Sequence, residues 1–192
     1  RIESPGDQEA IFNLASEILD KGEGLYISGR AGTGKTFLVK RLMKKLRDAG
    51  ERVIPISLTH VAAKLIEGMT AQRFLYKFRN NGTIENATIV IDELSFLGIS
   101  ILNSLCTLLS LKGIRTICSG CFEQLNPVSD IICGQTITRN GFQSSRLLHT
   151  MCSGNMIQLT QCRRSCRFLF DIYNNFLSGG SLSHLSVQQA VA

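Results

Sequence analysis

The sequence predicts an α/β fold with a doubly wound, mostly parallel sheet that carries helices on both faces. Three observations support this prediction. Short apolar runs alternate with segments of helical periodicity, the runs lack the polar alternation of a half-exposed strand, and a glycine-rich loop joins one run to a helix. With 192 residues and 44% hydrophobic composition, the chain is large enough for one domain with a sizeable core.

The N-terminal part of the chain accounts for a helix, a strand and a second helix. Apolar residues recur at helical spacing after Asp7, a residue type that caps helices, so a helix is expected over about residues 7–20. Two glycines end it, and the apolar run 25–27 then predicts a buried strand that enters a turn. A second helix is expected over about 34–48, with a basic outer face that we expect to be solvated rather than bound to nucleic acid.

The rest of the chain repeats this alternation of strand and helix. Apolar runs of about four residues predict strands, and longer segments with helical periodicity predict helices. In order, we expect strand 53–56, helix 60–67, strand 88–91, helix 98–110, strand 114–118, helix 143–151, strand 156–159 and helix 165–177. Residues 1–177 would then form one domain, and the Gly- and Ser-rich composition after it predicts a linker, or the start of a next segment, over 178–192.

Composition limits the partners and the compartment. The net charge of +6 favours an anionic partner, and nucleic acid is the first candidate. Seven scattered cysteines indicate reduced thiols inside a cell, such as in a nucleus, a mitochondrion or the host cell of a virus. A zinc site at Cys118, Cys121, Cys162 and Cys166 is a weaker alternative, because the middle gap is far longer than usual. No apolar run approaches the roughly 20 residues that span a bilayer, so we expect a soluble protein without a membrane partner.

The glycine-rich loop has the complete pattern G-x-x-x-x-G-K-[ST] of a phosphate-binding P-loop. It follows a predicted strand and opens a helix, so that backbone N–H groups and the helix N-terminus would surround the β- and γ-phosphates of a nucleotide. Lys35 adds a full positive charge, and the Thr36 hydroxyl is suited to Mg²⁺, which prefers oxygen ligands. The expected nucleotide-binding residues of the loop are Gly29, Ala31, Gly32, Thr33, Gly34, Lys35 and Thr36.

A second acidic element is expected at the end of a neighbouring strand, and Asp92-Glu93 after the run 88–91 supplies it. Asp92 is expected to hold Mg²⁺ through water, together with Thr36. Glu93 is then placed to orient and deprotonate the attacking water, which favours hydrolysis over transfer to a bound substrate. These elements alone leave motor ATPases, AAA-type switches and nucleotide kinases open, although a kinase would need lid arginines that are not evident here.

Further segments resemble, in order, the motifs of the Pif/RecD-like branch of superfamily 1 DNA helicases. Asp92-Glu-Leu-Ser-Phe-Leu97 resembles the D-E-[IL]-S-[MF]-L form of the acidic motif, and residues 120–128 resemble G-D-F-x-Q-L-P-P-V. The other matching segments are Gln8 ahead of the P-loop, Thr59-His-Val-Ala-Ala63, Gly68-Met-Thr70 before Phe74, Phe142-Gln-Ser-Ser-Arg146 and Leu159-Thr-Gln-Cys-Arg-Arg164. The resemblance covers about residues 5–180 and implies the RecA-like P-loop NTPase fold of a first motor domain.

The resemblance implies a role for each matching residue. Gln8 would read adenine, Gln124 would sense the γ-phosphate and Arg164 would contact it, so that Lys35, Glu93, Gln124 and Arg164 form the expected catalytic set. The expected DNA contacts are Thr59, His60, Gly68, Thr70 and Asn126. His60 could equally be a helix-start residue, and Phe74 is as well explained by a place in the core as by stacking on bases.

The activity implied is that of an ATP-dependent DNA helicase with Mg²⁺, acting on single-stranded and fork DNA with 5′-to-3′ movement. Nothing after Arg164 resembles the second RecA-like domain, so we expect that domain to lie outside this chain. The ATP cleft would then lack one wall, and the isolated chain is expected to bind nucleotide weakly and to unwind little.

The sequence departs from the family pattern at three positions, and the first of them favours an alternative hypothesis. Cys121 replaces the aspartate of G-D-F, Asn126 replaces a proline, and Arg163 replaces the phenylalanine before Arg164. A neutral thiol cannot act as a carboxylate, so the chain could instead be a degenerate P-loop domain that serves as a nucleotide switch or assembly module. The register favours Arg164 over Arg163 as the phosphate contact without excluding Arg163.

Overall fold

The computed structural model describes residues 2–3, 7–80, 84, 86–111, 114–121, 131–132, 135–136 and 146–163. Within them, seven strands form one sheet in the order β1-β9-β2-β6-β5-β3-β4, and every pairing in it is parallel. These strands are β1 (Ile2–Glu3), β2 (Leu25–Gly29), β3 (Arg52–Ser57), β4 (Met69–Thr70), β5 (Ala87–Ile91), β6 (Thr116–Gly120) and β9 (Met156–Leu159). A separate antiparallel pair is formed by β7 (Ile131–Ile132) and β8 (Gln135–Thr136).

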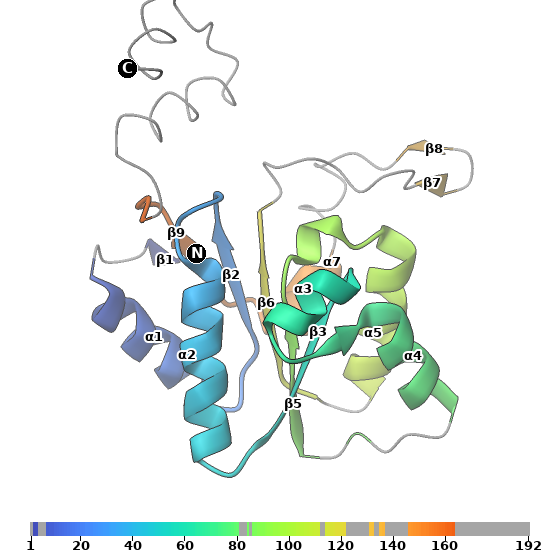
Figure 1. The fold of residues 1–192 in the computed structure, drawn as a ribbon, viewed down its shortest axis with the longest axis horizontal. Coiled ribbons are helices and arrows are strands. Elements are labelled where there is room, and N and C mark those ends of the chain that lie inside the picture. The colour runs from blue at the N-terminus through green and yellow to red at the C-terminus, as the bar shows by residue number, and fades with distance from the viewer. Residues whose placement is uncertain are drawn as a thin grey trace, which may run out of the picture.

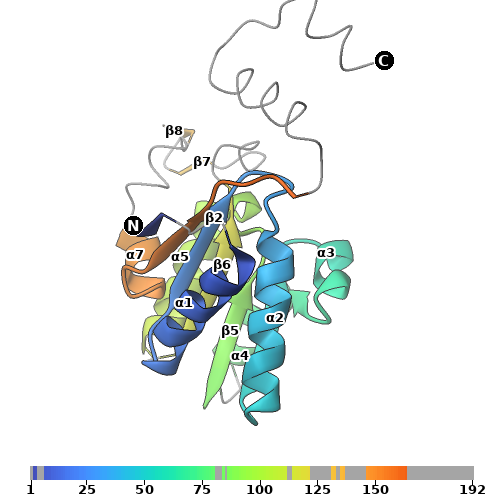
Figure 2. The same cartoon turned by 90° about the vertical axis from the view of Figure 1, so that its left-hand side faces the viewer.

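Helices cover both faces of the sheet, as Figure 1 shows with the sheet nearly edge-on and Figure 2 shows from the side. They are α1 (Gln8–Asp20), α2 (Lys35–Asp48), α3 (His60–Leu65), α4 (Ala71–Asn80), the 3-10 turn η1 (Leu94–Phe96), α5 (Ile99–Leu111) and α7 (Arg146–Met151). The predicted α/β, mostly parallel, two-sided architecture is therefore confirmed.

The alternation of side chains along the strands divides the core in two. In β2, Leu25 and Ile27 are buried against α1 and α2, whereas Tyr26 between them faces the cluster formed with α4, α5 and α7. In β5, Val90 joins the first cluster, while Ile89 and Ile91 join the second. Because successive strand residues point to opposite faces, an apolar run without alternation is what a doubly covered sheet requires.

The boundaries of the expected elements agree closely with the structure, except that the strand expected at 114–118 lies at Thr116–Gly120. The short strands β1, β4, β7 and β8, the 3-10 turn η1 and the helix α4 were not predicted. In α4, Phe74 and Phe78 are four residues apart with ring centroids at 4.8 Å, and both are buried. Phe74 is therefore a core residue and is not exposed for stacking on bases. The helix expected at 165–177 lies outside the described residues.

The basic outer face of α2 is occupied by ion pairs. Arg41 pairs with Glu9 at 2.9 Å, Lys44 with Asp48 at 2.6 Å, Lys45 with Asp20 at 2.6 Å and Arg47 with Glu67 at 3.3 Å. These acidic partners lower the positive potential of the face, in agreement with a solvated structural surface. Among the described helices, none is long and apolar enough to cross a membrane.

Arg115 joins four segments at the end of the sheet opposite the P-loop. Its Nη1 donates to the carbonyl of Leu19 at 2.6 Å, its Nε donates to the Thr88 hydroxyl at 3.0 Å, and its Nη2 pairs with the carboxylate of Glu51. The Arg115 side chain is only 15% exposed, and that of Glu51 is 38% exposed. Loss of the guanidinium therefore leaves buried acceptors without donors, which is costly.

We expect Arg115→Ala to lower the free energy of unfolding by about 2–3 kcal/mol, at the lower end of the range for broken buried pairs because Glu51 is partly solvated. Urea denaturation followed by circular dichroism measures the change. Arg52→Ala, at an exposed position in β3, is the matched control and should change stability by less than about 0.5 kcal/mol. Equal stability of the two variants would contradict the structural role of Arg115.

Candidate nucleotide-binding site

The P-loop connects β2 to α2 through a backbone that only glycine adopts readily. Gly32 and Gly34 have φ angles of +81° and +93°, in the left-handed region that other L-residues rarely occupy. A Cβ on Gly29 would lie 2.6 Å from Thr33 Oγ1 and 2.9 Å from the Leu159 carbonyl oxygen. The glycines of the motif therefore permit a tight loop that packs against β9, and Gly34 caps α2 without a side chain of its own.

Side chains of the loop stabilise this shape from within. The buried Thr33 hydroxyl donates to the Arg30 carbonyl at 2.8 Å. Lys35 Nζ donates to the carbonyls of Gly29 at 2.8 Å and Arg30 at 3.2 Å, and the residue is only 5% exposed. Its ammonium group thus lies inside the curve of the loop, where a phosphate would meet it together with the backbone N–H groups at the start of α2. Ala31 is exposed and Thr36 is half-buried in the first helical turn.

Asp92 lies directly after β5, but β5 does not neighbour the P-loop strand. Strand β6 lies between them and pairs with both. The expectation that the acidic element follows a neighbouring strand was therefore wrong, because the alternation of elements along the chain does not reveal the strand order. Ser119 of β6 bridges the gap, since its hydroxyl donates to Asp92 Oδ1 while both residues are buried. Ser119 was not anticipated, as a serine within an apolar run carries no specific signal.

Glu93 adopts a left-handed backbone conformation with φ of +56°, which is uncommon for a residue with a side chain. Burial raises the pKa of its carboxyl group above the ordinary value, the positive charge of Lys35 lowers it in part, and Asp92 raises it further. Among the described residues, no hydrogen-bond partner lies within reach of the buried Glu93 Oε2. A buried carboxylate next to a lysine, with an oxygen not engaged by the fold, is suited to receive a proton from water.

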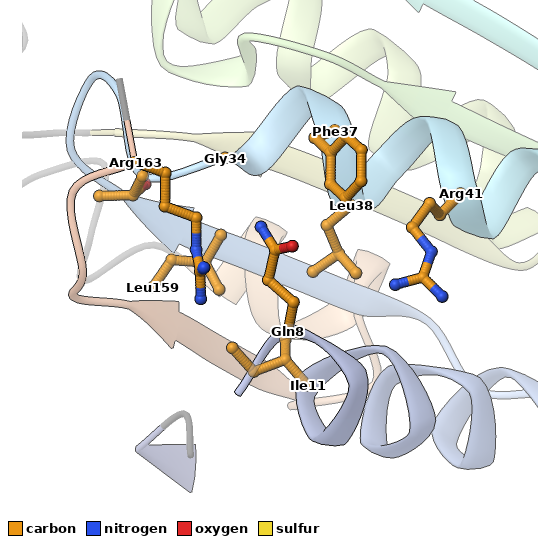
Figure 3. A pocket seen from close by; sticks show the side chains of 9 residues that line it. Gln8, Ile11, Gly34, Phe37, Leu38, Arg41, Leu159 and Arg163 are labelled. Atoms are coloured by element: carbon orange, nitrogen blue, oxygen red, sulfur yellow. The ribbon is translucent and has the colours of Figure 1, made fainter. Parts of the chain in front are cut away.

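A pocket borders the loop on the side of α1 and α2 (Figure 3). It is shallow and open to solvent, and is lined by Gln8, Ile11, Thr33, Gly34, Phe37, Leu38, Arg41, Leu159 and Arg163. Its apolar floor and few polar groups resemble a site for a flat heterocycle. Gln8 belongs to this set, as the resemblance implied, whereas Phe37, Leu38 and Arg41 were not singled out because they read as ordinary residues of α2.

Arg163 approaches the loop from β9. Its N–H donates to the Gly32 carbonyl at 2.8 Å, and its Cδ lies 3.7 Å from the position of a Cβ on Gly34. Arg163, the alternative to Arg164 as the phosphate contact, therefore lines this pocket and lies next to the P-loop. Gln124, Asn126 and Arg164, which were expected to contact phosphate or DNA, lie outside the described residues.

Of the residues expected to contact DNA, Thr59 and His60 follow β3, Gly68 precedes β4, and Thr70 is the last residue of β4. The carboxyl ends of β3 and β4 lie at the same edge of the sheet as the P-loop, because all these strands run parallel. Thr59 and His60 are exposed, and the Thr59 hydroxyl accepts the Ala62 N–H at 3.1 Å as the cap of α3. Thr70 is buried, and its hydroxyl accepts the Arg73 N–H at 3.3 Å. A Cβ on Gly68 would lie 2.3 Å from the Pro55 carbonyl oxygen, so this glycine permits close packing of two backbones.

Cys121 lies at the end of β6, next to the turn that carries Glu93. The thiol residue is buried, and its N–H donates to the Ser95 hydroxyl at 3.3 Å. Five described cysteines are free thiols: Cys106, Cys118, Cys121, Cys152 and Cys162. In the part of the chain that the structure describes, no group of three or more histidine, cysteine or acidic residues could hold a metal, which leaves the zinc alternative without support there.

The parallel sheet, the P-loop and the strand-end Asp92-Glu93 pair define a protein of the P-loop nucleotide-binding class. The match to the family model places the chain more closely. It belongs to the AAA-domain family, whose model matches residues 8–151.

Four relatives carry the name ATP-dependent DNA helicase Pif1, and three of them are described here. The one from Emericella nidulans is 29% identical over 148 residues, which cover 62% of this chain and 20% of the relative. The one from Bdellovibrio bacteriovorus is 30% identical over 141 residues, or 60% of this chain and 32% of the relative. The one from Trypanosoma brucei brucei is 36% identical over 97 residues, which cover 47% of this chain and 10% of the relative. The chain thus spans a third or less of these curated relatives.

Solved structures agree on the fold. The Pif1 helicase from Candida albicans superimposes with a TM-score of 0.71 at 24% identity, covering 98% of this chain and 47% of that chain. Bacteroides Pif1 bound to ssDNA gives a TM-score of 0.66 at 20% identity, covering 98% and 49%. Together with the sequence matches, these findings confirm the predicted Pif-like superfamily 1 motor domain and its RecA-like fold.

Proposed function

We propose that this chain is the first motor domain of an ATP-dependent DNA helicase whose second RecA-like domain lies elsewhere in a longer protein. The observation that carries the proposal is the convergence of Lys35, Asp92 and Glu93 at one edge of the sheet, inside a chain whose relatives are named as Pif1 helicases. The limited share of those relatives that the chain spans supports the assignment to one domain of several.

ATP would bind with its triphosphate on the loop Gly29–Thr36 and its base in the pocket beside Gln8. A phosphate at the loop would compete with the Gly29 and Arg30 carbonyls for the ammonium group of Lys35, exchanging two neutral acceptors for a charged one. A Bacteroides Pif1 structure contains ADP-AlF4, which supports a nucleotide as the ligand of this fold.

The oxygen groups available for a divalent cation are the hydroxyl of Thr36 and the carboxylate of Asp92. One hydroxyl and one carboxylate suit Mg²⁺, which is commonly held by few protein ligands together with waters and phosphates. Mg²⁺ would supply charge neutralisation at the phosphates. Ser119 holds Asp92 by a hydrogen bond to Oδ1 and thereby fixes the direction of its other oxygen.

Hydrolysis would depend on Glu93 as the group that receives the proton of the attacking water. Its raised pKa makes it a stronger base than an exposed carboxylate, and the positive charge of Lys35 lowers that pKa in part.

Single-stranded DNA would cross the edge of the sheet beyond β3 and β4. Thr59 and His60 are exposed there and could donate to phosphates, a contact that does not depend on sequence and that weakens with salt. The resemblance adds Gly68, Thr70 and Asn126 to this path, but Thr70 is buried and Asn126 lies outside the described residues. The DNA partner agrees with the net charge of +6 and with the ssDNA in the Bacteroides Pif1 structure.

The proposal predicts that the full-length protein unwinds a forked duplex that carries a 5′ single-stranded tail, in the presence of ATP and Mg²⁺. A strand-displacement assay with a fluorescent strand measures this activity. The same duplex with only a 3′ tail should be unwound at least about tenfold more slowly, because a translocating motor has one direction. Absence of unwinding on every substrate, with ATP still hydrolysed, would favour the nucleotide-switch alternative that Cys121 suggests.

A further inference from the structure

The position of Gln8 depends on the first turn of α1, because Gln8 is the first residue of that helix. Asp7 caps the turn by accepting the Glu9 N–H at 3.2 Å. The side chain of Gln8 reaches across to the P-loop, where its Nε2 lies 3.9 Å from the position of a Cβ on Gly34. Figure 3 shows the carboxamide at the centre of the pocket, between Arg163 and Leu38.

Arg41 of α2 holds this turn from the other side. Its Nη2 donates to both carboxylate oxygens of Glu9, at 3.2 and 2.9 Å, and its guanidinium carbon lies 4.1 Å from the centre of the Phe12 ring. Glu9 follows Gln8 in sequence and Phe12 lies one helical turn after it. One guanidinium group therefore contacts two side chains next to Gln8, which limits both rotation and sliding of the first turn of α1 against α2.

The carboxamide of Gln8 is suited to discriminate between purines. Adenine presents an amino donor and a ring-nitrogen acceptor on one edge, which a carboxamide can match with its oxygen and its nitrogen at once. Guanine presents two acceptors on the corresponding edge, and a carboxamide satisfies only one of them. This discrimination depends on hydrogen-bond geometry and is lost when the donor or acceptor is displaced by about an ångström.

We propose that Arg41 is a positioning residue that fixes Gln8 for the reading of adenine and thereby sets the base selectivity of the nucleotide site. The inference rests on the proposed nucleotide-binding function. The ion pair is partly exposed, with Arg41 at 32% and Glu9 at 59%, so it adds little to stability. Its effect is therefore expected in selectivity rather than in folding.

The test measures how ADP and GDP displace a ribose-linked fluorescent ADP from the full-length protein. The wild type is expected to bind ADP about tenfold or more tightly than GDP, the order expected for one bidentate base contact. Arg41→Ala should reduce this preference at least fivefold through weaker ADP binding, while GDP binding changes less than twofold. Glu9→Gln should shift the preference in the same direction. Lys44→Ala, which breaks an exposed pair one turn away from the pocket, is the control and should leave it unchanged.

A double-mutant comparison separates positioning from direct contact. If Arg41 acts through Gln8, then Arg41→Ala should have no further effect on selectivity in a Gln8→Ala background. Additive effects, an equal loss of ADP and GDP binding in Arg41→Ala, or an unchanged preference would each overturn the inference while leaving nucleotide binding intact. A full-length wild type that binds neither nucleotide would instead overturn the proposed function on which the inference rests.

Discussion

Replacement of Lys35 by alanine is expected to abolish ATP hydrolysis and to weaken nucleotide binding at least tenfold. The Nζ atom lies within the loop, bound to two carbonyls, and no exposed side chain can replace a buried full charge at the phosphates. We expect turnover to fall by about a thousandfold or more, as for loss of a major electrostatic contact in phosphoryl transfer. Phosphate release by the full-length protein and calorimetric titration with ATP measure the two effects.

Lys40→Ala provides a control for loss of charge from the same helix. Lys40 is exposed and lies on the outer face of α2, away from the loop. Lys40→Ala should change the turnover rate and the affinity for ATP by less than about twofold, because salt screens an exposed charge that lies at a distance from the site. A Lys35→Ala protein that retains turnover stimulated by single-stranded DNA would show that the site has been assigned wrongly.

Replacement of Glu93 by glutamine is expected to separate binding from hydrolysis. The amide has nearly the same shape but cannot accept the proton of water, so turnover should fall by about a hundred- to ten-thousandfold. ATP binding should remain within a few fold of the wild type, since Lys35 and the loop are unchanged. A rapid-quench measurement of bound ATP and released phosphate distinguishes the two steps. Normal turnover in Glu93→Gln would exclude this residue as the base.

The raised pKa of Glu93 predicts that Glu93→Gln, although it slows turnover, increases the stability of the fold. Burial raises the folded-state pKa, so protonation of Glu93 favours the folded state, and this contribution is lost as pH rises through the raised pKa. Above that pKa the wild type carries a partly buried charge that Glu93→Gln lacks. Glu93→Gln should therefore be more stable than the wild type at pH 8, with the difference shrinking toward pH 4, in urea unfolding curves. In the pH profile of turnover, the acidic limb should have its midpoint at a higher pH than an ordinary carboxylate would give.

The nucleotide site was largely predictable from the sequence, because its parts are local. The P-loop, its flanking strand and helix, and the pair Asp92-Glu93 each lie within a short segment whose spacing has a direct physical meaning. Because the sheet is parallel, the sequence also predicts that these parts lie at one edge of it. What the sequence did not reveal is the strand order, because a strand inserted between β2 and β5 leaves no trace in the alternation of elements.

Residues that act between segments were correspondingly hard to identify. Ser119 contacts Asp92 across two strands, and Arg41 contacts the first turn of α1 from a helix that reads as an ordinary amphipathic element. Likewise, Thr59 and Thr70 carry the hydroxyl groups expected at a DNA path, yet both hydroxyls also cap helices. A sequence pattern cannot distinguish a hydroxyl that caps a helix from one that binds phosphate, because the same residue types serve both purposes.

The most direct test of the account is the ATP hydrolysis rate of the full-length protein with and without single-stranded DNA. A DNA motor should hydrolyse ATP slowly alone and at least about tenfold faster when saturated with a single strand, and the stimulation should decline as salt is raised. The isolated 192-residue chain should show little of either activity. A rate that single-stranded DNA leaves unchanged at every salt concentration would contradict the assignment of this domain to a DNA motor.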